Sequence, residues 1–204
     1  ETGRPTYDPE HKPTTGSTTS FCPSLWGGKD WPPAAYNPET GLLYIPANDN
    51  HCGVIEGREG TYMPGSAYMG ARTQMTVSEG ADHIGEIQAW DMNTGEEVWT
   101  REFDSHNWGG ILTTSGNLIF SGGTSDRLFR AHNASTGELL WEFKTNSGII
   151  GVPSTFSVDG KQYVAVQAGW GVDAAGMTAR LDMVRGTRTF VPQGGVIWVF
   201  ALPD

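Results

Sequence analysis

The chain has 204 residues, with 28 glycines and 12 prolines but only 18% charged residues, a composition that favours many turns and few helices. Its formal net charge of −10, with 13 Lys and Arg that form no run, argues against a nucleic-acid partner. No apolar run approaches the roughly 20 residues of a membrane span. We therefore expect an all-β protein with no membrane span.

Residues 1–20 are polar, rich in Thr, Gly and Pro, and show no periodicity, which predicts an extended lead-in. Residues 21–31 carry a Gly-Gly pair between aromatic residues. The segment AYNPETGLLY follows at residues 35–44. Its Thr-Gly pair predicts a turn between two strands, near residues 34–37 and 42–46.

The same pattern returns twice in stronger form, as AWDMNTGEEVW at 89–99 and AHNASTGELLW at 131–141, 42 residues apart. Each copy predicts a strand that ends in Asx, a Thr-Gly turn, and a second strand whose Trp packs back on the sheet. The period is typical of a four-stranded β-propeller blade. Because one blade cannot bury both its faces, about three blades predict a propeller that another chain completes.

We predict a first blade over residues 21–103 with an insertion at 56–82, a complete blade over 110–145, and a partial last blade over 151–204 with an insertion at 168–194. The insertions lack a strand pattern, so we expect them on one face of the propeller. The remaining strands are predicted at 85–91, 96–103, 111–114, 118–121, 128–132, 139–143, 151–157, 162–167 and 195–202.

Two cysteines, Cys22 and Cys52, flank the first repeat and are separated by 30 residues. A disulfide between them would join the entry segment to the blade, and two free buried thiols are the alternative. The five histidines show no ligand spacing on a shared face, which predicts no metal site among them. The segment DMNTG at 91–95 looks like the start of a Ca²⁺ loop, but its repetition without a following Glu ligand indicates a turn.

Four segments resemble, in the same order, the carboxy-terminal part of the quinoprotein alcohol dehydrogenases, the methanol and ethanol dehydrogenase family that uses pyrroloquinoline quinone (PQQ). The segments are residues 21–48, which include GGKDW, 105–123, which include NWGG, 145–150 and 159–171. The resemblance implies an eight-bladed propeller with PQQ beside Ca²⁺ on its axis. The family's catalytic Asp and Ca²⁺ ligands lie on amino-terminal blades, so we expect no catalytic residue in this chain and activity only together with the chain that carries those blades.

The resemblance also implies cofactor-binding residues. Asp30 matches a family Asn that hydrogen-bonds the quinone edge; an ionised carboxylate only accepts, so beside anionic PQQ it requires a cationic neighbour or a raised pKa. Trp108 matches a Trp that points at the cofactor. Trp170 and Gly171 lie where the family's Gly-Trp pair approaches PQQ, although the usual Gly-Gly-Trp is replaced here. The alternatives are a solvent-facing turn for Asp30 and packing for both tryptophans.

The implied reaction is oxidation of an alcohol, in which a base takes the hydroxyl proton, hydride moves to the quinone and Ca²⁺ polarises the quinone oxygen. The pattern does not separate alcohols from polyols, sugars or aldehydes, nor a cytochrome c from a quinone as electron acceptor. The family also places a disulfide at Cys22 and Cys52, which implies the periplasm. The alternative function is a non-catalytic propeller scaffold that uses the same repeat.

Overall fold

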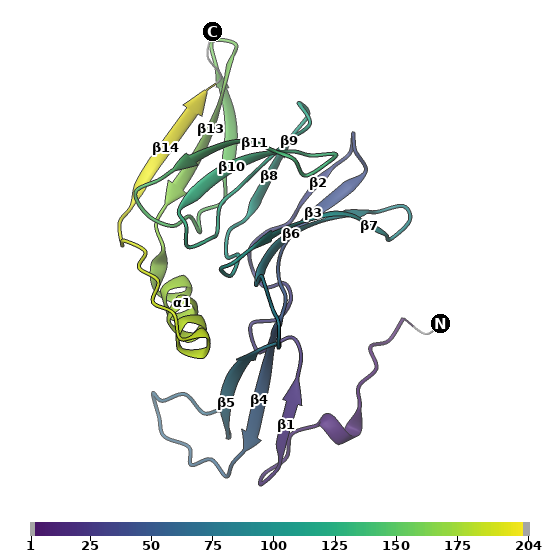
Figure 1. The fold of residues 1–204 in the computed structure, drawn as a ribbon, viewed down its shortest axis with the longest axis vertical. Coiled ribbons are helices and arrows are strands. Elements are labelled where there is room, and N and C mark those ends of the chain that lie inside the picture. Colours follow the sequence, from purple (N-terminus) through teal and green to yellow (C-terminus); the bar gives the residue numbers. More distant parts are fainter. Residues whose placement is uncertain (1–2, 202–204) are drawn as a thin grey trace.

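The computed structural model describes residues 3–201 as four antiparallel sheets, one α-helix and one short 3-10 helix (Figure 1). Among these residues no helix is long and apolar enough to cross a membrane. In chain order the elements are η1 (Pro9–His11), β1 (Thr18–Phe21), β2 (Ala35–Asn37), β3 (Leu42–Asn48), β4 (His51–Gly57), β5 (Ala71–Val77), β6 (Gly85–Asp91), β7 (Glu97–Phe103), β8 (Ile111–Thr114), β9 (Leu118–Ser121), β10 (Leu128–Asn133), β11 (Leu139–Lys144), β12 (Ser154–Val158), β13 (Lys161–Ala168), α1 (Gly171–Arg185) and β14 (Val196–Ala201).

Three of the sheets contain the strands predicted from the repeats: β2-β3-β6-β7, β8 to β11 in sequential order, and β12-β13-β14. The Asx residue of each repeat forms the turn between its two strands. The Asp91 side chain accepts from the Asn93 amide at 2.7 Å, and Asn133 accepts from the Ser135 amide at 2.9 Å. Gly137 closes the second of these turns at a φ of 69°, a conformation that glycine adopts without steric cost.

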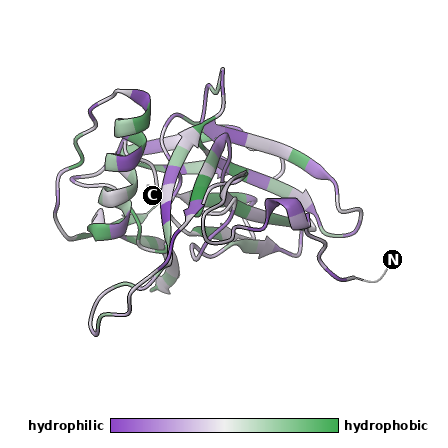
Figure 2. Ribbon diagram, turned by 90° about the horizontal axis from the view of Figure 1, so that it is seen from below, coloured by the Kyte–Doolittle hydropathy of each residue, from purple (hydrophilic) through white to green (hydrophobic). Residues whose placement is uncertain are grey.

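The three sheets stack face to face, and apolar residues of both neighbours fill each interface (Figure 1). The repeat Trp adds a specific contact between the first two sheets. Trp99 of β7 donates from Nε1 to the carbonyl oxygen of Ala134 at 3.0 Å. A Cβ on Gly137 would lie 2.6 Å from Cε3 of Trp99, so the indole requires a glycine in the turn that it covers. Figure 2 shows hydrophobic and hydrophilic residues following one another along the strands, as expected for elements with a buried and a solvated face.

A fourth sheet, β1-β4-β5, forms where the sequence predicted no strands. Strand β1 of the lead-in pairs with β4, and β5 lies within the predicted insertion at 56–82. The expected extended lead-in therefore ends in a paired strand, and the prediction of an insertion without strands is wrong. Strand β5 does alternate between partly buried and exposed residues, but its inward residues include Ala71 and Thr73, which are too small or too polar to give a clear pattern.

Helix α1 occupies the predicted insertion at 168–194, where no helix was expected. Its buried residues are Ala174, Thr178 and Leu181, spaced as one face of a helix. Two of the three are small or polar, so the stripe has little hydrophobic contrast, and Figure 2 shows both classes of residue along the helix. The helix ends at Gly186, which has a left-handed φ of 68° and donates to the Asp182 carbonyl.

The structure pairs Cys22 with Cys52 in a disulfide, with their Cα atoms 4.3 Å apart. Cys22 directly follows β1, and Cys52 lies on β4, the strand that pairs with β1. The predicted disulfide is therefore present. It fixes the central strand of the fourth sheet to the segment that leads into the first repeat, rather than joining two propeller sheets.

Candidate functional site

Trp108 lies in the connection between β7 and β8, which the two neighbouring asparagines hold in place. The Asn107 amide nitrogen donates to Oδ1 of Asn48 at 2.8 Å, and Nδ2 of Asn48 donates to the Asn107 carbonyl at 3.1 Å. The backbone nitrogen of Trp108 donates to the carbonyl of Gly123 at 2.9 Å. A Cβ at Gly109 would lie 2.9 Å from the backbone of Gly123, so this Asn-Trp-Gly segment requires its glycine.

Trp170 lies at the N-terminus of α1 and is 1% exposed. Its indole stacks on His106, with ring centroids 5.3 Å apart at 20°, and its Nε1 donates to Oγ1 of Thr178 at 3.2 Å. The backbone of Gly148 also packs against the indole, because a Cβ at Gly148 would lie 2.0 Å from Cε3 of Trp170. The next residue, Gly171, has a left-handed φ of 65° that starts the helix.

His106 lies among three tryptophans: Trp170 stacks on it, and the rings of Trp26 and Trp108 lie edge-on at 6.0 and 6.4 Å. The Thr178 hydroxyl donates to the carbonyl oxygen of Ala174 at 2.8 Å, so it accepts from Nε2 of His106 at 3.2 Å, and the imidazole proton is therefore on Nε2. Burial lowers the pKa of His106 to about 4, which keeps the ring neutral.

The Asp30 side chain is exposed, and it accepts a hydrogen bond from the backbone nitrogen of Trp31 at 2.7 Å. Lys29 is the cationic neighbour that the sequence analysis required, although its Nζ donates to the Asp30 carbonyl oxygen, at 2.6 Å, and not to the carboxylate. Trp31 is half exposed and lies edge-on to Trp108, with ring centroids 6.3 Å apart. The Asp30 loop thus borders the tryptophan cluster.

Of the four predicted cofactor-binding residues, Trp108, Trp170 and Gly171 therefore lie at one cluster, and Asp30 reaches it through Trp31. Both predicted tryptophans are covered within this chain, Trp108 being only 2% exposed. Sequence reasoning missed His106, although it directly precedes the Asn-Trp-Gly-Gly segment, because only spacings between histidines were considered.

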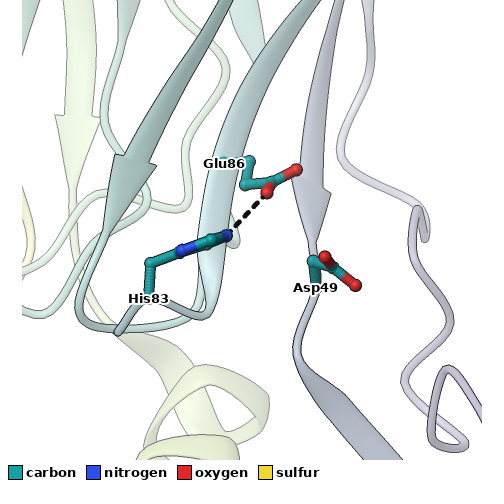
Figure 3. A group of neighbouring side chains, drawn as sticks. All are labelled: Asp49, His83 and Glu86. Carbon is teal, nitrogen blue, oxygen red and sulfur yellow. Dashed lines mark hydrogen bonds and ion pairs between the residues drawn. The ribbon is translucent and has the colours of Figure 1, made fainter. Parts of the chain in front are cut away.

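A second group of titratable side chains lies at the β3 and β6 ends of the first sheet (Figure 3). Ligand-type atoms of Asp49, His83 and Glu86 all lie within 4.8 Å of one another. Burial lowers the pKa of His83, but its hydrogen bonds to Asp82 and Glu86 outweigh burial, so the pKa lies above its usual value. The spacing of the histidines predicted no metal site among them. That spacing does not include the combination of one histidine with carboxylates.

Comparison with known proteins shows which family the chain resembles. Residues 101–164 match the model of the "Glucose/ethanol/alcohol dehydrogenase, beta-propeller domain". The chain is 40% identical to "Quinoprotein alcohol dehydrogenase PedH" of Pseudomonas putida over 98% of its length, and 38% identical to "Lanthanide-dependent methanol dehydrogenase" of Methylacidiphilum fumariolicum over 99%. Over nearly its whole length the chain is similar to quinoprotein alcohol dehydrogenases.

The solved structures show the same similarity. A chain of "Europium-containing methanol dehydrogenase" superposes with a TM-score of 0.81 at 37% identity, over 96% of this chain. Together with the family model, this similarity confirms the predicted all-β propeller fold. The chain spans about a third of the length of these relatives, covering 34% of PedH and 36% of the Methylacidiphilum enzyme.

Proposed function

We propose that the chain is the carboxy-terminal part of a periplasmic, PQQ-dependent dehydrogenase that oxidises alcohols, with its catalytic Asp and metal ligands on the amino-terminal blades. The observation that carries this proposal is the identity of 37 to 40% with alcohol and methanol dehydrogenases, which extends over nearly the whole chain. Bound PQQ would supply the two-electron acceptor for the alcohol. The metal is Ca²⁺ or, as in the relative from Methylacidiphilum, a lanthanide.

The residues of this chain fit a flat, anionic cofactor at the tryptophan cluster. The buried Nε1 of Trp108 is a donor without a hydrogen-bond partner among the described residues. The exposed Trp31 offers an aromatic ring beside it, and Lys29 supplies a positive charge. In this proposal Trp108, Trp170 and Gly171 form the rigid wall of the cofactor site, and Asp30 lies at its edge.

The wall would orient the cofactor and exclude water from it rather than transfer a proton. His106 is neutral because of its burial, and its Nε2 proton is held by Thr178, so it positions Trp170 instead of acting as an acid. The alcohol, polyol, sugar or aldehyde substrate would approach from the remaining blades. Electrons would leave to a cytochrome c or a quinone, and the disulfide between Cys22 and Cys52 suits the oxidising periplasm.

The first test is native mass spectrometry of the purified protein, followed by denaturing mass analysis of every chain and small molecule released. We expect the remaining two thirds of the quinoprotein to be present, together with PQQ and a metal ion. Dye-coupled oxidation of alcohols after loading with PQQ and either Ca²⁺ or La³⁺ then measures activity. A protein that contains no PQQ, takes up none and oxidises no alcohol would contradict the proposal and favour the non-catalytic scaffold.

A matched pair of variants tests Asp30. Asp30→Asn removes a carboxylate that would repel the anionic cofactor, and at about 4 Å such repulsion is worth roughly 1 to 4 kcal/mol. We expect Asp30→Asn to bind PQQ about tenfold more tightly in the assembled enzyme. Asp159→Asn removes an equal charge from the turn between β12 and β13 and is the control. Equal affinities for the two variants would remove Asp30 from the cofactor site.

A further inference from the structure

Three metal-ligating side chains from separate positions in the chain meet beside the first propeller sheet (Figure 3). Asp49 follows β3, His83 precedes β6, and Glu86 lies on β6. Nε2 of His83 lies 2.8 Å from Oε1 of Glu86. Glu86 is 5% exposed, whereas Asp49 is exposed, so the group has a buried floor and an open side.

Further contacts hold two of the three side chains from behind. Nδ1 of His83 lies 2.7 Å from Oδ1 of Asp82, which leaves Nε2 as the atom that faces Glu86. The other carboxylate oxygen of Glu86 accepts from Nε2 of Gln88 at 2.6 Å, and Gln88 in turn accepts from Nε1 of Trp90 at 3.0 Å. A carboxylate on the distal nitrogen of a histidine, and a bonded distal oxygen on a ligating carboxylate, are the usual outer-shell supports of a metal site.

A fourth donor lies next to the imidazole. The side-chain amide of Asn50 lies 3.1 Å from Nε2 of His83, and a rotation of that amide would present its oxygen instead of its nitrogen. The donors are then one imidazole nitrogen, two carboxylates and one amide oxygen. This mixture of nitrogen and oxygen suits a divalent transition ion such as Zn²⁺ better than Ca²⁺ or Mg²⁺, which prefer oxygen throughout.

The charge around His83 is strongly negative. Carboxylates of Asp82 and Glu86 accept hydrogen bonds from its ring, Oε2 of Glu102 lies 3.8 Å from Nδ1, and Asp49 completes the group. A proton on His83 neutralises only one of these four carboxylates, whereas a divalent cation at Nε2 neutralises two. Asp49 is exposed and lines an open hollow of about 630 Å³, so this ligand of the group is accessible from solvent.

We propose that Asp49, His83 and Glu86, with Asn50 as the fourth ligand, bind one Zn²⁺ ion. Binding forms a bond from Zn²⁺ to Nε2 and releases the Nε2 proton of the imidazolium to solvent. The competing explanation is a permanent imidazolium, whose two nitrogens both donate to carboxylates and leave no position for a metal. The two explanations differ in zinc affinity and in proton release, and neither depends on PQQ.

The test is calorimetric titration of Zn²⁺ into the chelator-treated chain at neutral pH, in buffers of different ionisation enthalpy. We expect one ion per chain, a micromolar or lower Kd, and release of up to one proton. Co²⁺, added in place of Zn²⁺, should give a visible absorption spectrum with nitrogen ligation. Absence of saturable binding by the chain, or all-oxygen ligation of Co²⁺, would overturn the proposal.

Variants test which side chains are the zinc ligands. His83→Gln should abolish zinc binding, and Asp49→Asn should weaken it at least about tenfold. Asp49 is exposed, so its replacement carries the test even if His83→Gln fails to fold. His11→Gln is the control, because His11 also lies beside a carboxylate, 3.7 Å from Asp8, but on the exposed lead-in. Zinc affinity that Asp49→Asn leaves unchanged, or that His11→Gln lowers equally, would refute the assignment.

Discussion

Replacing Gly148 with alanine is expected to destabilise the chain by about 3 kcal/mol. The new Cβ would lie 2.0 Å from Trp170, whose ring is packed between that backbone and His106. Overpacking of this kind costs about 1 to 3 kcal/mol. Displacing the indole also loses its hydrogen bond to Thr178, worth about 1 kcal/mol, and part of the ring stacking, worth about 0.5 to 1.5 kcal/mol.

The assay is urea unfolding of the chain, followed by tryptophan fluorescence and far-UV circular dichroism. Gly176→Ala is the control, since Gly176 lies on helix α1, whose N-cap is Trp170, and a Cβ there meets nothing within 4 Å. Alanine has a higher helix propensity than glycine, so Gly176→Ala should stabilise the chain by about 0.5 to 1 kcal/mol. The reasoning would be refuted if Gly148→Ala unfolded at the wild-type urea concentration, or if Gly176→Ala were the more damaging change.

Replacing both Cys22 and Cys52 with alanine should lower the free energy of unfolding by about 3 to 4 kcal/mol, as loop closure over their separation of 30 residues predicts; an unchanged thermal midpoint would argue against this. Burial lowers the pKa of His106 and His132 to about 4, helped for His132 by two arginines, so the unfolded chain takes up protons first as pH falls. Stability should be intact above about pH 6.5 and fall by about 2 kcal/mol per histidine by pH 5, with further loss to about pH 4. The raised pKa of His83 stabilises the folded chain as pH falls, which opposes this loss. Urea midpoints at pH 7 and 5 are measured for the wild type and for His132→Gln, and the midpoint of His132→Gln should change less between the two pH values.

The repeat strands could be predicted because their signal is local. The Asx and Thr-Gly residues specify the turns of the repeats by hydrogen bonds within a few positions, so β6 ends at the Asx where the sequence indicated. Strands β8 and β9, on either side of Ser115 and Gly116, also have their predicted bounds. Strand β1 could not be found in this way. It pairs with β4 more than 30 positions later, and no turn residue in the lead-in indicates that pairing.

The site shows the same distinction. Motifs within one segment led to Asp30, Trp108 and Trp170, but only the fold brings Trp26 and Trp170 to His106. Asp49 lies close to His83 and Glu86 because β3 pairs with β6, which sets the end of one strand beside the start of the other. The spacing of residues in a single sequence does not indicate which strands pair.

The contact between Trp99 and the turn at Gly137 also bears on how the protein is made. Trp99 belongs to β7, but its acceptor, Ala134, is synthesised 35 residues later. As the chain leaves the ribosome, the first sheet can form its hydrogen bonds but cannot seat its tryptophan until most of the second sheet has emerged. The first sheet should therefore complete its packing only after the second sheet has been synthesised. In a nascent chain arrested before residue 134, Trp99 should remain accessible to fluorescence quenchers.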